Sequence, residues 1–86
     1  ELVGHGIGTK LHLEPQIPNF SSPTSADHNV ELKEGMCLAI EPMVNLGSRF
    51  IKTDSDGWTI RTQDGQPSAH FEHSILITKL QPRILT

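Results

Sequence analysis

No stretch of about ten or more residues in this chain shows the apolar spacing that is typical of an amphipathic helix. The apolar residues fall instead into short runs, which are separated by Gly, Pro, Asn and Asp. These four residue types favour turns and loops. The chain is therefore expected to be mostly β-structure, built from short strands.

The strongest strand signal lies at residues 36–41, which are apolar until Glu41. They predict a buried strand that Pro42 ends. Residues 58–62 alternate between apolar and polar types, as in a half-buried strand, and residues 69–78 predict a further strand. Asp64-Gly65 is a hairpin signal between these last two.

The remaining segments are expected to be extended or looped. Residues 1–13 read as a short strand, a glycine turn and a second extended piece at 9–13. Residues 14–24 contain three prolines and are expected to form an ordered loop, because proline is excluded from helix interiors and central strands. Turns are expected at 33–35 and 54–57, and a loop at 45–48.

The core of such a chain is thin. Only 35% of the 86 residues are hydrophobic, and a chain of this length buries about 60% of its unfolded surface. Disulfides cannot compensate, because Cys37 is the only cysteine. A single thiol is typical of a reducing, cytoplasmic compartment. The chain also starts without Met and opens directly on a glycine-rich motif, so we expect it to be a piece of a longer polypeptide.

Charge and hydropathy exclude two classes of partner. The net charge is −3, whereas a nucleic-acid-binding surface shows clustered Lys and Arg. The longest apolar run, at 36–40, is far shorter than the roughly 20 residues that span a bilayer. The first residues lack the pattern of a signal peptide. We expect neither a nucleic-acid nor a membrane partner.

Three ionisable residues stand among apolar or glycine neighbours on expected strands: His5, Glu41 and Glu72. An unpaired carboxylate outside water is costly, so it either changes protonation or finds a cation. Two carboxylates and an imidazole on rigid strands suit a divalent metal. His12 adds a second imidazole seven residues after His5.

Each of these residues has a simpler interpretation. A strand Glu often pairs with Lys or Arg or points to solvent, and His5 is also explained as a turn residue. The remaining candidates fit ordinary structural roles: His28, His70 and His73 as surface or supporting groups, Asp27, Asp54, Asp56 and Asp64 as turn residues, and Cys37 as a small core hydrophobe. Spacing alone leaves these alternatives open.

Three motifs in this order resemble the signature of the methionine aminopeptidases: GHGIGTKLHLEP (4–15) with IPNF (17–20), EGM (34–36) leading to IEPMVN (40–45), and DGWT (56–59) leading to FEH (71–73). They span about residues 3–78. The proline-specific peptidases of the same pita-bread group usually carry Glu-Pro-Gly where this chain has Glu41-Pro42-Met43. The short connection after residue 20 resembles the type I enzymes.

The resemblance implies an α+β pita-bread fold, of which residues 1–86 are the C-terminal half and mostly antiparallel β. It implies that His5, Glu41 and Glu72 are three of the five protein ligands of two divalent ions, with Glu72 bridging them. The other two ligands in the family are aspartates in the preceding half. Co, Mn, Fe and Zn suit these donors alike.

The implied reaction is removal of the N-terminal methionine from nascent proteins in the cytoplasm. Glu41 would move the proton, His12 would hydrogen-bond the substrate, and Trp58 would line the methionine pocket. An ordinary core anchor is the alternative role of Trp58. The chain alone is expected to be inactive without the N-terminal half, its implied partner.

This sequence departs from the family pattern at three positions: Leu11 replaces the usual Phe, Ala39 the usual Thr and His70 the usual Gln. These departures concern the pocket and leave the implied ligands intact. An alternative function remains, in which the fold is catalytically silent and serves to bind another protein.

Overall fold

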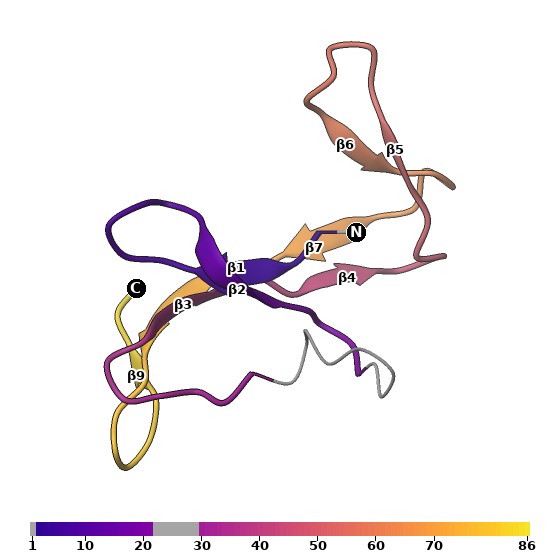
Figure 1. The fold of residues 1–86 in the computed structure, drawn as a ribbon. Coiled ribbons are helices and arrows are strands. Elements are labelled where there is room, and N and C mark those ends of the chain that lie inside the picture. The colour runs from indigo at the N-terminus through magenta and orange to yellow at the C-terminus, as the bar shows by residue number, and fades with distance from the viewer. Residues whose placement is uncertain (1, 22–29) are drawn as a thin grey trace.

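The computed structural model describes residues 2–21 and 30–86, and within them all regular structure is β (Figure 1). The strands are β1 (Gly4–Gly6), β2 (Leu13–Ile17), β3 (Cys37–Ile40), β4 (Met43–Asn45), β5 (Ile51–Thr53), β6 (Ile60–Thr62), β7 (Ser68–His70), β8 (His73–Leu76) and β9 (Arg83–Ile84). The mostly antiparallel β-structure expected from the sequence is confirmed.

The main sheet has five strands in the order β2-β1-β3-β8-β9, and every pair in it is antiparallel. The buried strand predicted at 36–41 is present over residues 37–40 as β3, whose end residues are half-buried and which lies at the centre of this sheet. Leu38 and Ala39 are 1% and 0% exposed, and they are the buried apolar residues of the described chain. The core therefore sits on the central strand.

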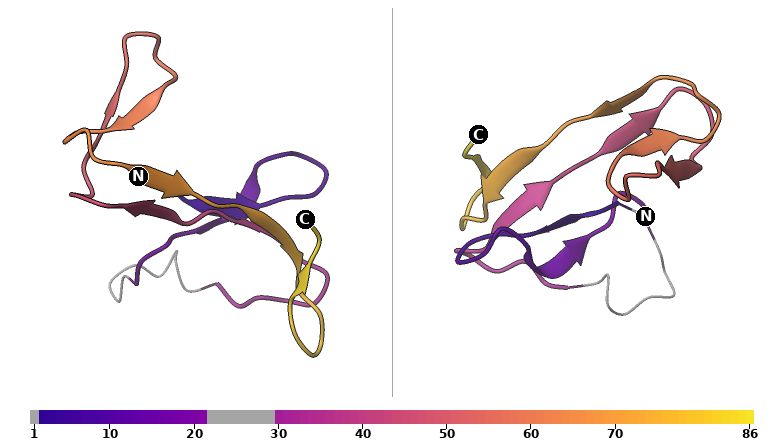
Figure 2. Two further views of the ribbon diagram at one scale, coloured as in Figure 1. Left: turned by 180° about the vertical axis from the view of Figure 1, so that it is seen from behind. Right: turned by 90° about the horizontal axis from the view of Figure 1, so that it is seen from above.

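The segments around Pro42 and Phe71 join two short ladders into one long ribbon. Strand β3 pairs with β8 and β4 pairs with β7, so the two halves run side by side along the molecule (Figure 2). Ile40 pairs with His73 and Met43 with His70, which means that the register is the same on both sides of the break. The break itself retains one backbone bond, in which the Phe71 amide donates to the Pro42 carbonyl at 3.2 Å.

At this break the structure differs from two predictions made from the sequence. The strand predicted at 69–78 is two strands, β7 and β8, because Pro42 on the facing segment lacks the amide hydrogen that a continuous ladder needs. Pro42 ends β3 as predicted, but the chain pairs again at once as β4, which the sequence analysis did not predict.

The expected loop at 14–24 is also wrong over residues 14–17, which belong to β2 with Pro15 at its middle. Strand β2 lies at the edge of the sheet, where the outward side of a strand has no ladder partner, so proline is tolerated there. The extended piece predicted at 9–13 is likewise wrong, because residues 8–12 bend and the strand begins at Leu13. The end of the expected loop, residues 22–24, lies outside the described residues.

The hairpin assignment differs from the expected one. Strand β6 pairs with β5 rather than with the strand that follows it, so residues 54–59 connect the hairpin. The predicted turns at Gly35 and Gly57 are confirmed, with φ of 91° and 71°. Asp64-Gly65 does form a turn, with φ of 74° at Gly65, but it redirects the chain from β6 to β7. Strands β5 and β9 were not predicted.

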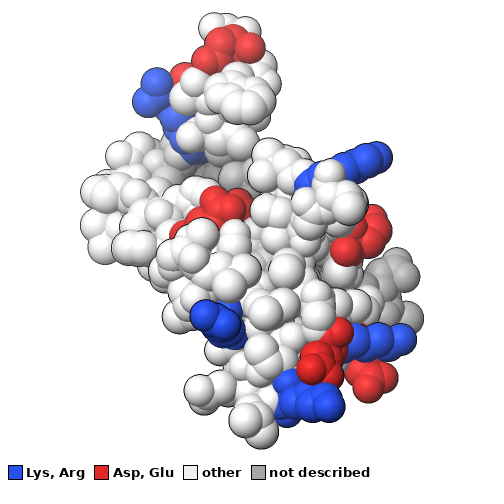
Figure 3. All heavy atoms as spheres, turned by 90° about the vertical axis from the view of Figure 1, so that its left-hand side faces the viewer, with Lys and Arg blue, Asp and Glu red and all other residues white. Residues whose placement is uncertain are grey.

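The molecule is open rather than globular. Its radius of gyration is 14.7 Å, against about 12 Å for a compact domain of this length. Its accessible surface is 6919 Å², against about 5,000 Å² for a compact monomer of this mass. The β5–β6 hairpin projects from the body (Figure 1), and on the face drawn in Figure 3 wide uncharged areas separate the charged side chains. Many large apolar side chains remain exposed, including Phe50, Trp58 and Leu80.

Within the described residues, no helix is long and apolar enough to cross a membrane.

Candidate metal centre

His5, Glu41 and Glu72 lie on three neighbouring segments of one sheet. The common register of the two ladders places Glu41 directly opposite Glu72 at the break in the ribbon. His5 on β1 pairs with Ala39, two residues before Glu41 and therefore on the same face of the sheet. A bulge between His5 and Gly6 shifts the pairing with β2 at this point. The topology thus gathers the three side chains.

One donor atom from each of these three residues lies within 4.8 Å of the other two. Two donors bound to opposite sides of one ion are about 4.2 Å apart, since metal–ligand bonds measure about 2.1 Å. The limit of 4.8 Å is about half an ångström more than this separation, so the cluster has nearly the width that one ion needs. The convergence expected from the sequence is present among the described residues.

Within the cluster, His5 Nε2 lies 3.0 Å from Glu41 Oε2. The other ring nitrogen, Nδ1, lies 2.9 Å from the Gly6 carbonyl oxygen and is positioned to donate to it. Both side chains are well covered, with 12% and 17% of their surface exposed. A backbone carbonyl on Nδ1 is a common way to orient a metal-binding histidine.

The chemistry of this donor set fits a divalent cation. With Nδ1 donating to Gly6, a neutral His5 ring presents its Nε2 lone pair to the Glu41 carboxylate. Two acceptors facing each other repel unless a proton or a cation lies between them. Two donors bound at right angles to one ion are about 3 Å apart, close to the Nε2–Oε2 separation. Imidazole and carboxylate donors together suit Mn, Fe, Co and Zn.

The alternative in which these carboxylates pair with Lys or Arg is not found. Within the described residues, the ion pair that involves such a side chain joins Arg61 to Asp54. The ion-pair partners of Glu41 are the imidazoles of His5 and His70. Glu72 is exposed in this chain, yet one of its oxygens faces the other two donors.

His12 lies beside the cluster without joining it. Its ring packs edge-on against His5, with centroids 4.3 Å apart and planes 61° apart. It sits in the bent segment before β2 and is exposed. This position leaves its ring nitrogens available to a molecule that approaches the cluster.

His70 is an exposed neighbour of the cluster, in agreement with the surface or supporting role that the sequence analysis gave it. Its Nε2 lies 3.5 Å from Glu41 Oε1, the oxygen that does not face His5. His73, by contrast, points to the chain end, with Nδ1 2.9 Å from the Thr86 carbonyl oxygen. Asp27 and His28 lie outside the described residues. That His70 faces Glu41 in particular follows from the register, which places the two residues diagonally on one face.

An open cleft of about 840 Å³ lies next to His70, and the three clustered residues do not line it. Apolar side chains from β4, β5 and β6, and from the segments at residues 20 and 50, line much of it: Phe20, Met43, Phe50, Ile51 and Ile60. His70 both lines this cleft and faces Glu41, so it connects the cleft to the cluster.

Trp58 is 86% exposed, at the tip of the β5–β6 hairpin. The alternative that it anchors the core of this chain is therefore wrong.

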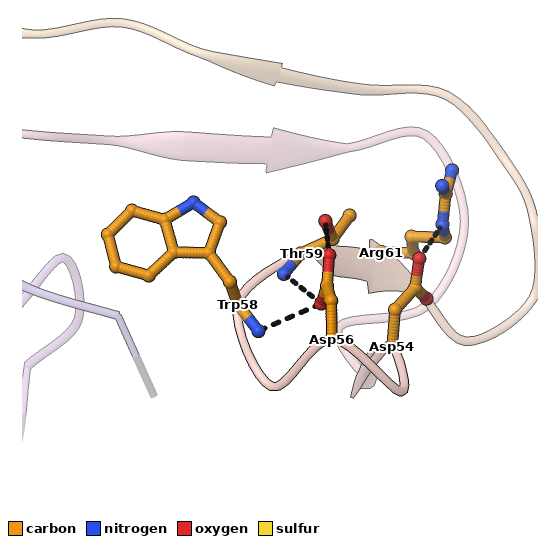
Figure 4. A network of polar contacts seen from close by, with 5 residues as sticks. All are labelled: Asp54, Asp56, Trp58, Thr59 and Arg61. Atoms are coloured by element: carbon orange, nitrogen blue, oxygen red, sulfur yellow. Dashed lines mark hydrogen bonds and ion pairs between the residues drawn. The ribbon is translucent and has the colours of Figure 1, made fainter.

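Hydrogen bonds to Asp56 hold the tip of the hairpin (Figure 4): one oxygen of Asp56 accepts from the Trp58 and Thr59 amides, and the other accepts from the Thr59 hydroxyl. Beside it, Arg61 Nε contacts Asp54 at 2.7 Å. These turn roles of Asp54 and Asp56 agree with the sequence analysis.

These contacts predict how acid affects the hairpin tip. Hydrogen bonds from the Thr59 side chain, the Thr59 amide and the Trp58 amide hold the pKa of Asp56 below its ordinary value of 3.8. Because the pKa of Asp56 is lower in the folded tip than in the unfolded chain, its ionised carboxylate stabilises the folded tip at pH values above 3.8. This stabilisation is lost as the pH falls through the lower pKa of the folded state. We expect the Thr59 amide resonance to titrate with a midpoint below 3.8, and to stop titrating in Asp56→Asn. A midpoint at or above 3.8 would contradict this.

Comparison with known proteins agrees with the geometry. Residues 1–79 match the family model of metallopeptidase family M24. The chain is 55% identical over 86 residues to methionine aminopeptidase 1 of Bacillus subtilis, covering 100% of this chain and 34% of that protein. It is 48% identical over 86 residues to the methionine aminopeptidase of Escherichia coli K12, covering 100% of this chain and 31% of that protein.

Solved structures give the same result. The methionine aminopeptidase of Thermotoga maritima matches with a TM-score of 0.89 and 52% identity, covering 98% of this chain and 32% of that one. The enzyme from Rickettsia prowazekii matches with a TM-score of 0.85 and 41% identity, covering 95% of this chain and 32% of that one. The expected pita-bread fold is confirmed, and the chain spans about a third of the length of its relatives. The chain belongs to metallopeptidase family M24.

Proposed function

We propose that this chain is the C-terminal part of the catalytic domain of a type I methionine aminopeptidase, a metal-dependent hydrolase that removes the N-terminal methionine from nascent proteins. The observation that carries the proposal is the convergence of His5, Glu41 and Glu72 within 4.8 Å on one sheet. Relatives of this chain that bear the name methionine aminopeptidase support the substrate class.

The three clustered residues would hold two divalent ions, drawn from Co, Mn, Fe and Zn, together with ligands from another part of the domain. Glu72, which stands opposite Glu41 in the common register and is exposed in this chain, would be the ligand that both ions share, as the resemblance to the methionine aminopeptidases implies. When bound, such ions activate a water molecule and polarise the scissile carbonyl.

The chain's own groups supply proton transfer and substrate contacts. A carboxylate oxygen of Glu41 takes the proton of the attacking water and passes it to the leaving amine. His12 donates a hydrogen bond to the substrate near the scissile bond and stabilises the developing negative charge. Its exposed ring beside His5 suits this role. Trp58, exposed at the hairpin tip, is proposed to line the pocket for the methionine side chain.

The proposed partners are peptide or protein N-termini that begin with Met, and the N-terminal half of the same domain. The thin core and the exposed apolar side chains support the second partner, because such surface is normally covered in a stable fold. The single cysteine and the nascent-chain substrate support a cytoplasmic location.

The direct test uses the complete protein that contains this chain, a Met-Ala-Ser peptide and controlled metal content. We expect free methionine to appear, to disappear after chelation, and to return when Mn²⁺ or Co²⁺ is added back. A peptide that begins with Gly serves as the substrate control. Tight binding of metal-loaded protein to peptides without release of methionine would instead favour a catalytically silent binding protein.

A further inference from the structure

Glu41 lies between two histidines that come from opposite directions. His5 on β1 faces Oε2 at 3.0 Å, and His70 at the end of β7 faces Oε1 at 3.5 Å. In its proposed role, Glu41 would bind a metal ion through one carboxylate oxygen and also take a proton from water. Both tasks need a fixed carboxylate plane, and a carboxylate held at one oxygen rotates about the Cγ–Cδ bond unless the second oxygen also accepts a hydrogen bond.

We propose that His70 is a positioning residue, which donates a hydrogen bond from Nε2 to Oε1 of Glu41 and so fixes the plane of that carboxylate. The proposal rests on the proposed metal site and extends it to a residue that is not among its ligands. The 3.5 Å separation is about half an ångström longer than a typical N–H···O bond, so the proposed bond requires His70 and Glu41 to move closer by that amount.

The backbone positions both residues of the His70–Glu41 contact. Met43 pairs with His70, and Glu41 precedes Met43 by two residues, so the His70 and Glu41 side chains lie on one face as diagonal neighbours. The backbone of Glu41 is held as well, because the Asn19 side-chain amide donates to its carbonyl at 3.1 Å. With the backbone fixed, the remaining freedom of Glu41 is in its side chain, which the two histidines restrict.

The exposure of His70 gives this contact a second consequence. The His70 side chain is 51% exposed and lines the cleft, whereas the Glu41 side chain is 17% exposed. A molecule in the cleft that touches His70 therefore acts on the orientation of Glu41 without reaching it. Groups that orient a metal ligand commonly change metal affinity by about 10–100-fold when they are removed.

The test compares three variants of the complete protein. His70→Leu removes the donor, and His70→Gln keeps an N–H donor of similar reach. His73→Leu removes an imidazole that faces Thr86 instead of Glu41, so it is the matched control. The first readout is Mn²⁺ affinity by calorimetry without substrate. We expect a loss of about 10–100-fold in His70→Leu, and values within about threefold of the unsubstituted protein in the other two.

The second readout is the ¹³C shift of the Glu41 side-chain carboxylate in metal-free protein, assigned by its loss in Glu41→Gln. We expect this shift to move in His70→Leu and to stay in His73→Leu, with His70→Gln close to the unsubstituted protein. An unchanged carboxylate shift in His70→Leu would overturn the proposal, as would equal losses in His70→Leu and His70→Gln. Absence of Mn²⁺ binding in the unsubstituted protein would count against the proposed function, while the carboxylate shift still decides the role of His70.

Discussion

The purified 86-residue chain, supplied with Mn²⁺ or Co²⁺, is expected to release no methionine from Met-Ala-Ser. Two of the five ligands that the family resemblance implies have no matching position in this sequence, so at least one ion would lack the negative charge that holds it. The cluster is also open to water here, as the exposed Glu72 indicates, and water weakens every electrostatic interaction in a site.

Complementation provides the control for this expectation. Adding the separately produced N-terminal half is expected to restore methionine release, because it would supply the missing ligands and cover exposed apolar surface. The same mixture made with a Glu72→Gln chain should remain inactive, which separates rebuilding of the site from mere association. Methionine release by the isolated chain, without any other protein present, would refute the proposal that the ligand set is divided.

In the complete protein, Glu72→Gln is expected to weaken metal binding by at least about 100-fold, more than the loss of an orienting group costs. A neutral amide cannot balance the charge of two cations as a bridging carboxylate does. His12→Ala is expected to keep its metal and to lose about 10²–10³-fold in kcat, the usual cost of removing a donor that stabilises the transition state.

Metal content and methionine release, measured on the same samples, distinguish these two roles. His73→Leu is again a useful control, because it removes an imidazole next to Glu72 that contacts the chain end. Equal metal loss in Glu72→Gln and His12→Ala would contradict the division between ligand and substrate-binding residues. His12 packs edge-on against His5, so a small decrease in affinity in His12→Ala is compatible with the proposal.

The sequence by itself determined the family, the central strand and the candidate ligands. The uninterrupted apolar run at 36–40 favours a buried strand, and residues 37–40 form β3 at the centre of the sheet, where Leu38 and Ala39 are buried. The sequence also predicted the turns at Gly35 and Gly57. Glycine readily adopts the positive φ that the structure has at both positions, and this conformation depends on few neighbours. The ordered motifs around His5, Glu41 and Glu72 pointed to one metallopeptidase family, to which the chain belongs.

Only the tertiary structure decided which segments pair and which side chains meet. Pro15 lies in a strand because β2 is an edge strand, and position within a sheet is not readable from local periodicity. The break between β7 and β8 depends on Pro42, which lies on the facing segment far away in the sequence. The contact of His70 with Glu41 follows from the same register. Pairing over such separations depends on the whole sheet, and local sequence carries little of that information.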